Sequence, residues 1–138
     1  MITAQRPFAK VAGLRDALRS AVDQSSKGQQ LILIQAHPDL GGKLAKAGNL
    51  SPDSMNEQAG VGLDKLTNAQ FEKITNLNSR YQEKFGFPFV ICARKTSQTE
   101  ILNAFENRMH NPVDAEFLMA LSQIHEIAEL RLLDLVKA

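Results

Sequence analysis

The sequence predicts an all-α fold, a single-domain helical bundle covering residues 1–138. Several long segments place apolar residues three or four positions apart, which is typical of amphipathic helices. Serine or threonine stands where helices are expected to begin, and glycine or proline where they are expected to end. Only two apolar runs of four to five residues resemble strands, so helices packed on helices are the favoured architecture.

The first helix is expected over residues 8–23, whose shared apolar face comprises Phe8, Val11, Ala12, Leu14, Leu18 and Val22. Gly28 is expected to close this region with a turn. The apolar run at residues 31–34 is compatible with a buried strand or a buried helix, because periodicity does not separate the two over so short a length. Its helical surroundings favour the helix.

Two helix starts follow. Ser51 is typical of an N-cap residue with Pro52 at the first helical position. Thr67 and Gln70 match a capping box, which opens a helix expected to end near Phe85-Gly86. Its apolar face comprises Phe71, Ile74, Leu77, Asn78 and Tyr81. Phe87–Val90 is then expected to run extended and buried, because proline disfavours helix for its predecessor and aromatic rings favour burial.

Ser97 and Glu100 match a further capping box, which introduces a helix that ends before Asn111-Pro112. A long final helix is expected after it, with an apolar face made by Phe117, Ala120, Leu121, Ile124, Ile127, Ala128 and Leu135. Arg131 falls on this same face, four residues after Ile127, so the pattern predicts an arginine that points inward.

Composition limits the function classes. A net charge of +1, with basic residues spread along the chain, disfavours nucleic acid as a partner. The single cysteine, Cys92, lies in an apolar run and is expected to be buried and reduced. There is no apolar run long enough for a membrane span and no secretory signal, so a soluble cytoplasmic protein without membrane contact is expected.

Titratable and amide groups gather in residues 37–58, beside glycines 41, 42, 48, 60 and 62. His37 has an ordinary pKa near 6.5 that suits proton transfer, although alone it would more often be structural. Asp39 could orient His37 or, preferably, cap the next turn. Ser54 and Glu57 match a capping box. Glu57 and Gln58 together could also form hydrogen bonds to a urea-like or imide-like group of a ligand, and the two uses are compatible.

Arg131 has two balanced interpretations: its charge extends to solvent at a helix end, or it binds a substrate carboxylate. His37, Asp39 and Glu57 could in principle hold a metal, but paired histidines or cysteines are missing, so no metal is expected. His110 and His125 are not expected to be catalytic. Nucleophile-elbow and phosphate-loop patterns are absent from the sequence.

Four ordered motifs resemble the OHCU decarboxylases, which act on 2-oxo-4-hydroxy-4-carboxy-5-ureidoimidazoline (OHCU) in urate breakdown. The motifs are His37-Pro38-Asp39-Leu40-Gly41, Ser54-x-x-Glu57-Gln58, Phe85-Gly86-Phe87-Pro88-Phe89-Val90 and Ile127-Ala128-x-x-Arg131-Leu132. The resemblance extends from Arg6-Pro7-Phe8 to the last helix. Family members usually carry a further N-terminal segment, often with a tryptophan, and this chain is expected to lack it.

The resemblance implies an all-helical homodimer that converts OHCU to (S)-allantoin and carbon dioxide without a cofactor. It further implies that the catalytic residues are His37, which is the acid/base, and Glu57. The substrate-binding residues implied in the same way are Pro38, Ser54, Gln58, Phe87, Phe89, Val90 and Arg131.

Two other functions remain open from the sequence. In a non-catalytic helical module that binds a peptide or metabolite, the capping and packing interpretations would all hold, and the four polar residues would be scattered. A cofactor-free hydrolase or tautomerase of a related ureide would keep the pocket and change the product. Convergence of His37, Glu57, Gln58 and Arg131 on one cavity would favour an enzyme.

Overall fold

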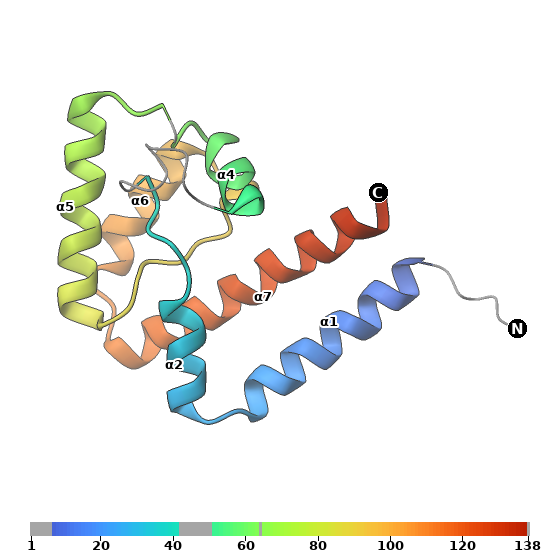
Figure 1. Ribbon diagram of the computed structural model, residues 1–138. Helices are drawn as coiled ribbons and strands as arrows, with labels where there is room; N and C mark the ends of the chain where they lie inside the picture. Colours follow the sequence, from blue (N-terminus) through green and yellow to red (C-terminus); the bar gives the residue numbers. More distant parts are fainter. Residues whose placement is uncertain (1–6, 42–50, 64, 138) are drawn as a thin grey trace, which may run out of the picture.

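The computed structural model describes residues 7–41, 51–63 and 65–137, and all regular elements in these ranges are helical. The all-α prediction is confirmed. Figure 1 shows α1 and α7 side by side and antiparallel, with α5, α6 and α4 grouped on the other side of α7. The predicted positions at Arg6, Gly42 and Gly48 lie outside the described residues.

The two N-terminal helices are α1 (Pro7–Gln24) and α2 (Lys27–Gln35). Both the first predicted helix and the helical interpretation of residues 31–34 are confirmed. The prediction for Gly28 is wrong, because this glycine lies in the first turn of α2. Ser26 caps α2 by accepting a hydrogen bond from the backbone N–H of Gln29, so the chain turns at Ser25 and Ser26 instead.

Helix α4 (Pro52–Ala59) begins as predicted, with Ser51 as N-cap and proline in its first turn. The predicted capping box of Ser54 and Glu57 is therefore wrong. Ser51 Oγ already accepts the hydrogen bond from Ser54 N, at 3.3 Å, which places Ser54 and Glu57 inside the helix. Their side chains are thus available to a neighbouring surface.

Helix α5 (Asn68–Phe85) has the predicted capping box of Thr67 and Gln70. It ends at Gly86, whose φ of 81° lies in the left-handed region that glycine adopts without strain. In α6 (Gln98–Arg108) only half of the predicted box forms, since Ser97 Oγ accepts from Glu100 N. The long final helix is confirmed as α7 (Val113–Lys137).

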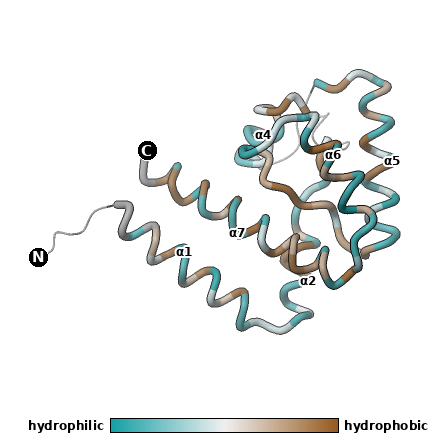
Figure 2. The backbone as a smooth tube through the Cα atoms, turned by 180° about the vertical axis from the view of Figure 1, so that it is seen from behind, coloured by the Kyte–Doolittle hydropathy of each residue, from teal (hydrophilic) through white to brown (hydrophobic). Residues whose placement is uncertain are grey.

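Between α5 and the short 3-10 helix η1 (Ala93–Lys95) the chain crosses the core without regular structure, which confirms the extended prediction for Phe87–Val90. This stretch, with Ile91 and Cys92, is buried, and the brown tube in Figure 2 shows it as a continuous apolar segment. Phe89 stacks on Phe105 with ring centroids 3.9 Å apart, and Tyr81 meets both rings edge-on. The burial predicted for Cys92 is confirmed. None of the helices in the described ranges is long and apolar enough to cross a membrane.

Candidate active site

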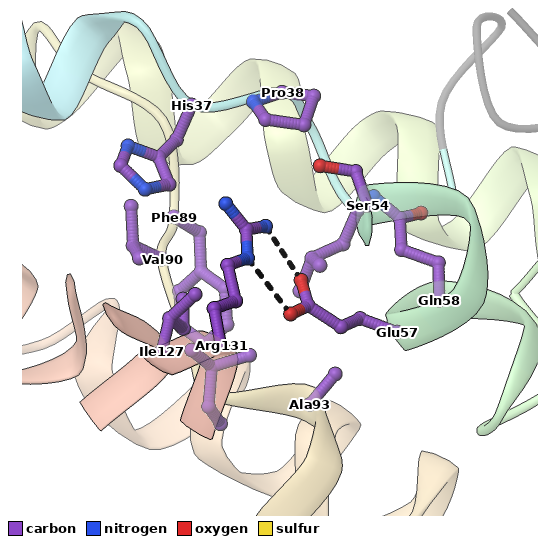
Figure 3. A pocket seen from close by; sticks show the side chains of 12 residues that line it. His37, Pro38, Ser54, Glu57, Gln58, Phe89, Val90, Ala93, Ile127 and Arg131 are labelled. Carbon is purple, nitrogen blue, oxygen red and sulfur yellow. Dashed lines mark hydrogen bonds and ion pairs between the residues drawn. The ribbon is translucent and has the colours of Figure 1, made fainter. Parts of the chain in front are cut away.

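A small pocket opens where α2, α4, α7 and the extended segment meet (Figure 3). The empty space in and around it amounts to about 400 Å³, open solvent at its mouth included. The polar side chains that line it are His37, Ser54, Glu57, Gln58 and Arg131, and its other walls are Pro38, Leu40, Phe89, Val90, Ile91, Ala93 and Ile127. Residues that are up to 94 positions apart in sequence, His37 and Arg131, thus converge on one cavity.

His37 lies just beyond the end of α2, and its backbone N–H still donates to Ile34 O. Its Nδ1 lies 3.1 Å from Leu33 O. Since a carbonyl oxygen only accepts, Nδ1 carries the proton and Nε2 is left with a lone pair in the neutral ring. Burial lowers the pKa of His37 below its ordinary value of 6.5, and the positive charge of Arg131 adds to this effect. The neutral ring is the form able to accept a proton at neutral pH.

Asp39 does not orient His37, whose ring bonds to Leu33 O. Nor does it cap the turn at Gly41, whose N–H donates to Gln58 Oε1 instead. Asp39 Oδ1 instead accepts a 2.6 Å hydrogen bond from Gln82 Nε2. Because this partner comes from α5, Asp39 joins the loop after α2 to that helix rather than to its own turn.

Glu57 and Arg131 form a side-on, two-point ion pair across the pocket. Arg131 Nε donates to Glu57 Oε2 at 3.0 Å, and Nη2 donates to Oε1 at 2.7 Å. The hydrogen bonds that Arg131 donates to Glu57 are the largest cause that raises the pKa of Arg131, so the guanidinium stays charged. The third guanidinium nitrogen points toward His37 (Figure 3). The inward position predicted for Arg131 is confirmed, and the interpretation in which it extends to solvent is wrong.

Gln58 is buried beside the pocket, and its amide holds the loop that follows His37. Its Oε1 accepts from Gly41 N at 2.9 Å, and its Nε2 donates to Asp39 O at 3.2 Å. The tight fit explains Gly41: its φ is +60°, and a Cβ there would lie 2.9 Å from Leu66 Cδ1. Among the described residues, no partner takes the second Nε2 proton of Gln58, which can therefore serve a ligand.

The extended segment contributes Phe89 and Val90 to the pocket wall, as predicted. Phe87 does not line this pocket; its ring packs against Tyr81, Phe85 and Phe117. His125 is also absent from the lining, and its Nε2 lies 3.6 Å from Asp23 Oδ1.

Sequence reasoning missed the buried pair of Arg108 and Glu116, which lies behind the wall. Arg108 stands three positions after Phe105 and seven after Ile101, both of which are core residues of α6. A charged residue on the apolar face of a helix was therefore the signal that could have revealed it.

Comparisons with known proteins agree with this geometry. The family model described as OHCU decarboxylase matches residues 1–133. The OHCU decarboxylase of Haloferax volcanii is 42% identical over 127 residues, which cover 92% of this chain and 73% of that protein. The one from Xenopus laevis is 34% identical over 134 residues, covering 97% and 77%.

Solved structures with a similar fold come from the same family. A crystal structure of OHCU decarboxylase in the presence of (S)-allantoin superposes with a TM-score of 0.75 at 25% identity, covering 93% of this chain and 82% of that one. A crystal structure of (S)-allantoin synthase has a TM-score of 0.68 at 32% identity, covering 90% and 37%. The chain belongs to the OHCU decarboxylase family, the carboxy-lyases of urate degradation.

Proposed function

We propose that this chain decarboxylates OHCU to (S)-allantoin and carbon dioxide in the pocket around His37. The observation that carries the proposal is the convergence of His37, Glu57, Gln58 and Arg131 on one cavity. A module in which these residues served only as caps and packing groups would have no reason to bring a neutral imidazole, a carboxylate and a guanidinium together.

The substrate supplies its own electron sink. Its carboxylate is attached to the carbon next to a ring carbon–nitrogen double bond. When that carbon–carbon bond breaks, carbon dioxide leaves and the electron pair moves through the ring to the nitrogen, which takes up one proton from solvent. The hydroxyl group then loses its proton to become a carbonyl, and the neighbouring ring carbon gains one. The protein therefore has to orient the substrate, stabilise charge and move protons.

His37 is suited to the last of these tasks. Its Nε2 can accept the hydroxyl proton and return a proton to the ring carbon, because Nδ1 is already committed to Leu33 O. Both steps occur on the side of the planar intermediate that faces the imidazole. Delivery from one side gives a single enantiomer.

Arg131 and Glu57 would hold the two ends of the substrate. The guanidinium nitrogen that points toward His37 offers hydrogen bonds to the substrate carboxylate, while Glu57 accepts from ureido N–H groups. The free proton of Gln58 and the hydroxyl of Ser54 complete the polar contacts, and Pro38 lies at the same rim. Phe89 and Val90 exclude water, which strengthens these interactions. The backbone of Phe87, next to this wall, is a further candidate contact.

The family resemblance also supports a homodimer located in the cytoplasm, built from one domain over residues 1–138. Light scattering coupled to size-exclusion chromatography tests the first point by giving the mass in solution. A mass near 15.2 kDa, that of one chain, would contradict it.

Product analysis tests the function itself. The purified protein is added to freshly generated OHCU labelled with ¹³C at the carboxylate, and NMR follows labelled carbon dioxide and the ring product together. We expect both to form faster than in spontaneous decay. A ureide hydrolase or tautomerase would consume OHCU while keeping the labelled carbon in the product.

A further inference from the structure

We propose that Arg108 is a positioning residue for the decarboxylation, because it fixes the Phe89–Val90 wall of the pocket from behind. This inference rests on the proposed function for its catalytic consequence, although the position of the wall can be measured without substrate. Arg108 itself does not line the pocket, and its side chain is 9% exposed.

The wall needs an external support because it belongs to neither a helix nor a sheet. A backbone carbonyl buried in such a segment must find a donor elsewhere in the protein. Arg108 Nη1 provides it, donating to Val90 O at 2.8 Å. Its guanidinium carbon also lies 4.2 Å from the centroid of the Phe89 ring, in cation–π contact. The Arg108 side chain thus contacts both residues of the wall.

Arg108 is in turn held by an acidic partner in the core. Its Nε donates to Oε1 of Glu116 at 2.8 Å, and Glu116 is fully buried. The same carboxylate accepts hydrogen bonds from Tyr81 Oη, at 2.5 Å, and from Asn111 Nδ2, at 2.9 Å. Burial, followed by the bond to Glu116, raises the pKa of Tyr81, so its hydroxyl stays a donor. The guanidinium therefore has a fixed plane and direction.

Precision at the wall matters to the chemistry. Phe89 and Val90 face the cavity in which His37 meets the substrate. A wall displaced by about 1 Å would admit water and tilt the planar intermediate, and displacements of that size can reduce rates by about a hundredfold. Protonation from both faces would then lower the enantiomeric purity of the product.

The reaction rate of Cys92, the only cysteine of the chain, can show whether the Phe89–Val90 wall stays in place. It is buried two residues after Val90, and its N–H donates to Gln123 Oε1. Its reaction with a soluble disulfide reagent is slow while the segment is held in place. A loosened wall exposes the thiol and speeds the reaction, with no substrate required.

The test compares Arg108→Lys with Tyr81→Phe. Lysine keeps a charge next to Glu116 but cannot reproduce the planar fork that also serves Val90 O. Phenylalanine keeps the ring and removes one hydrogen bond to the same carboxylate, without touching Val90 O. For Arg108→Lys we expect Cys92 to react about tenfold faster, kcat/KM to fall by about tenfold or more, and enantiomeric purity to drop. For Tyr81→Phe all three values should stay within about twofold of the wild type, even as its melting temperature falls.

If Arg108→Lys does not fold, the pair Arg108→Met with Glu116→Gln removes both buried charges, and the same three changes are expected. Wild-type Cys92 reactivity, turnover and enantiomeric purity in the Arg108 variants would overturn the proposal. Equal losses in Tyr81→Phe would also overturn it, since they would reflect general destabilisation. If the wild-type protein does not turn over OHCU, the proposed function fails, while the Cys92 rates still decide whether Arg108 holds the wall.

Discussion

Two of the arginine–glutamate pairs among the described residues have almost equal lengths but very different surroundings. Arg108 and Glu116 lie 2.8 Å apart with side chains 9% and 0% exposed. Arg131 and Glu57 lie 2.7 Å apart with side chains 33% and 14% exposed. The first pair stands behind the pocket wall, and the second stands in the pocket itself.

Their partners explain the difference. Glu116 accepts additional hydrogen bonds from Tyr81 and Asn111, so its charge is fully enclosed by protein donors. Glu57 bonds only to Arg131 among the residues that the structure describes. A pair that keeps solvent on one side can exchange partners with an incoming anion at small cost. Burial and the number of hydrogen-bond partners, rather than the length of the ion pair, therefore distinguish a structural pair from a pair that can bind a ligand.

The largest expected effect comes from breaking the buried pair. Glu116→Ala leaves the Arg108 charge uncompensated in the core, which should lower the free energy of unfolding by about 3–5 kcal/mol. Urea unfolding followed by circular dichroism measures it. Glu57→Ala is the matched control in the half-buried pair and should lower the free energy of unfolding by clearly less than Glu116→Ala, because solvent reaches the Arg131 charge that it leaves. Equal losses of unfolding free energy in the two variants would contradict the proposed difference between the two pairs.

The half-buried pair of Arg131 and Glu57 should matter for activity instead. Arg131→Met removes the guanidinium that faces His37 and is expected to reduce kcat/KM by about a hundredfold to a thousandfold, as for loss of one electrostatic contact at a reacting centre. Steady-state assays with OHCU measure the loss. The unfolding midpoint in urea should stay near that of the wild type. A variant that is fully active would remove Arg131 from substrate binding.

Of the two pairs, only the half-buried one is expected to act on the titration of His37. Burial lowers the pKa of His37, Arg131 lowers it further, and Glu57 raises it. Since the neutral ring is the base, kcat/KM should rise with pH through a midpoint below 6.5 and level off above that midpoint. Glu57→Gln removes a charge that favours protonation, so this midpoint should move to lower pH. A midpoint that moves upward would contradict the assignment of His37 as the base.

The smallest effect is expected at a third pair, on the surface. Arg94 Nη1 lies 2.6 Å from Asp134 Oδ2, closer than the atoms of the two pairs compared above, and Asp134 is 52% exposed. Arg94→Met should nevertheless change the free energy of unfolding by less than about 1 kcal/mol, because water replaces the lost partner. Thermal unfolding checks this value. A loss as large as that of Glu116→Ala would show that distance, not burial, controls these pairs.

Much of the fold follows from local signals. Periodicity located α1, α5, α6 and α7, and the capping residues Ser51, Thr67 and Ser97 marked three helix starts. The errors were also local. Ser26, rather than Gly28, sets the turn after α1, because a hydroxyl cap decides where a helix begins even when glycine follows.

The site was predictable in its members but not in their arrangement. The inward direction of Arg131 could be read from its place on the apolar face of the last helix. Its pairing with Glu57 could not, because contacts over 74 positions depend on how α4 and α7 pack. The same holds for Gln58, whose amide is partly committed to the loop at Asp39 and Gly41.

The central claim is that His37 turns OHCU into one enantiomer of allantoin. Circular dichroism followed over time after addition of freshly generated OHCU tests it most directly, because uncatalysed decay yields a planar intermediate that is protonated from both faces. We expect a rapid signal of (S)-allantoin with the wild-type protein and only slow, optically silent decay with a folded His37→Ala variant. An equally fast optical signal from His37→Ala would contradict the account.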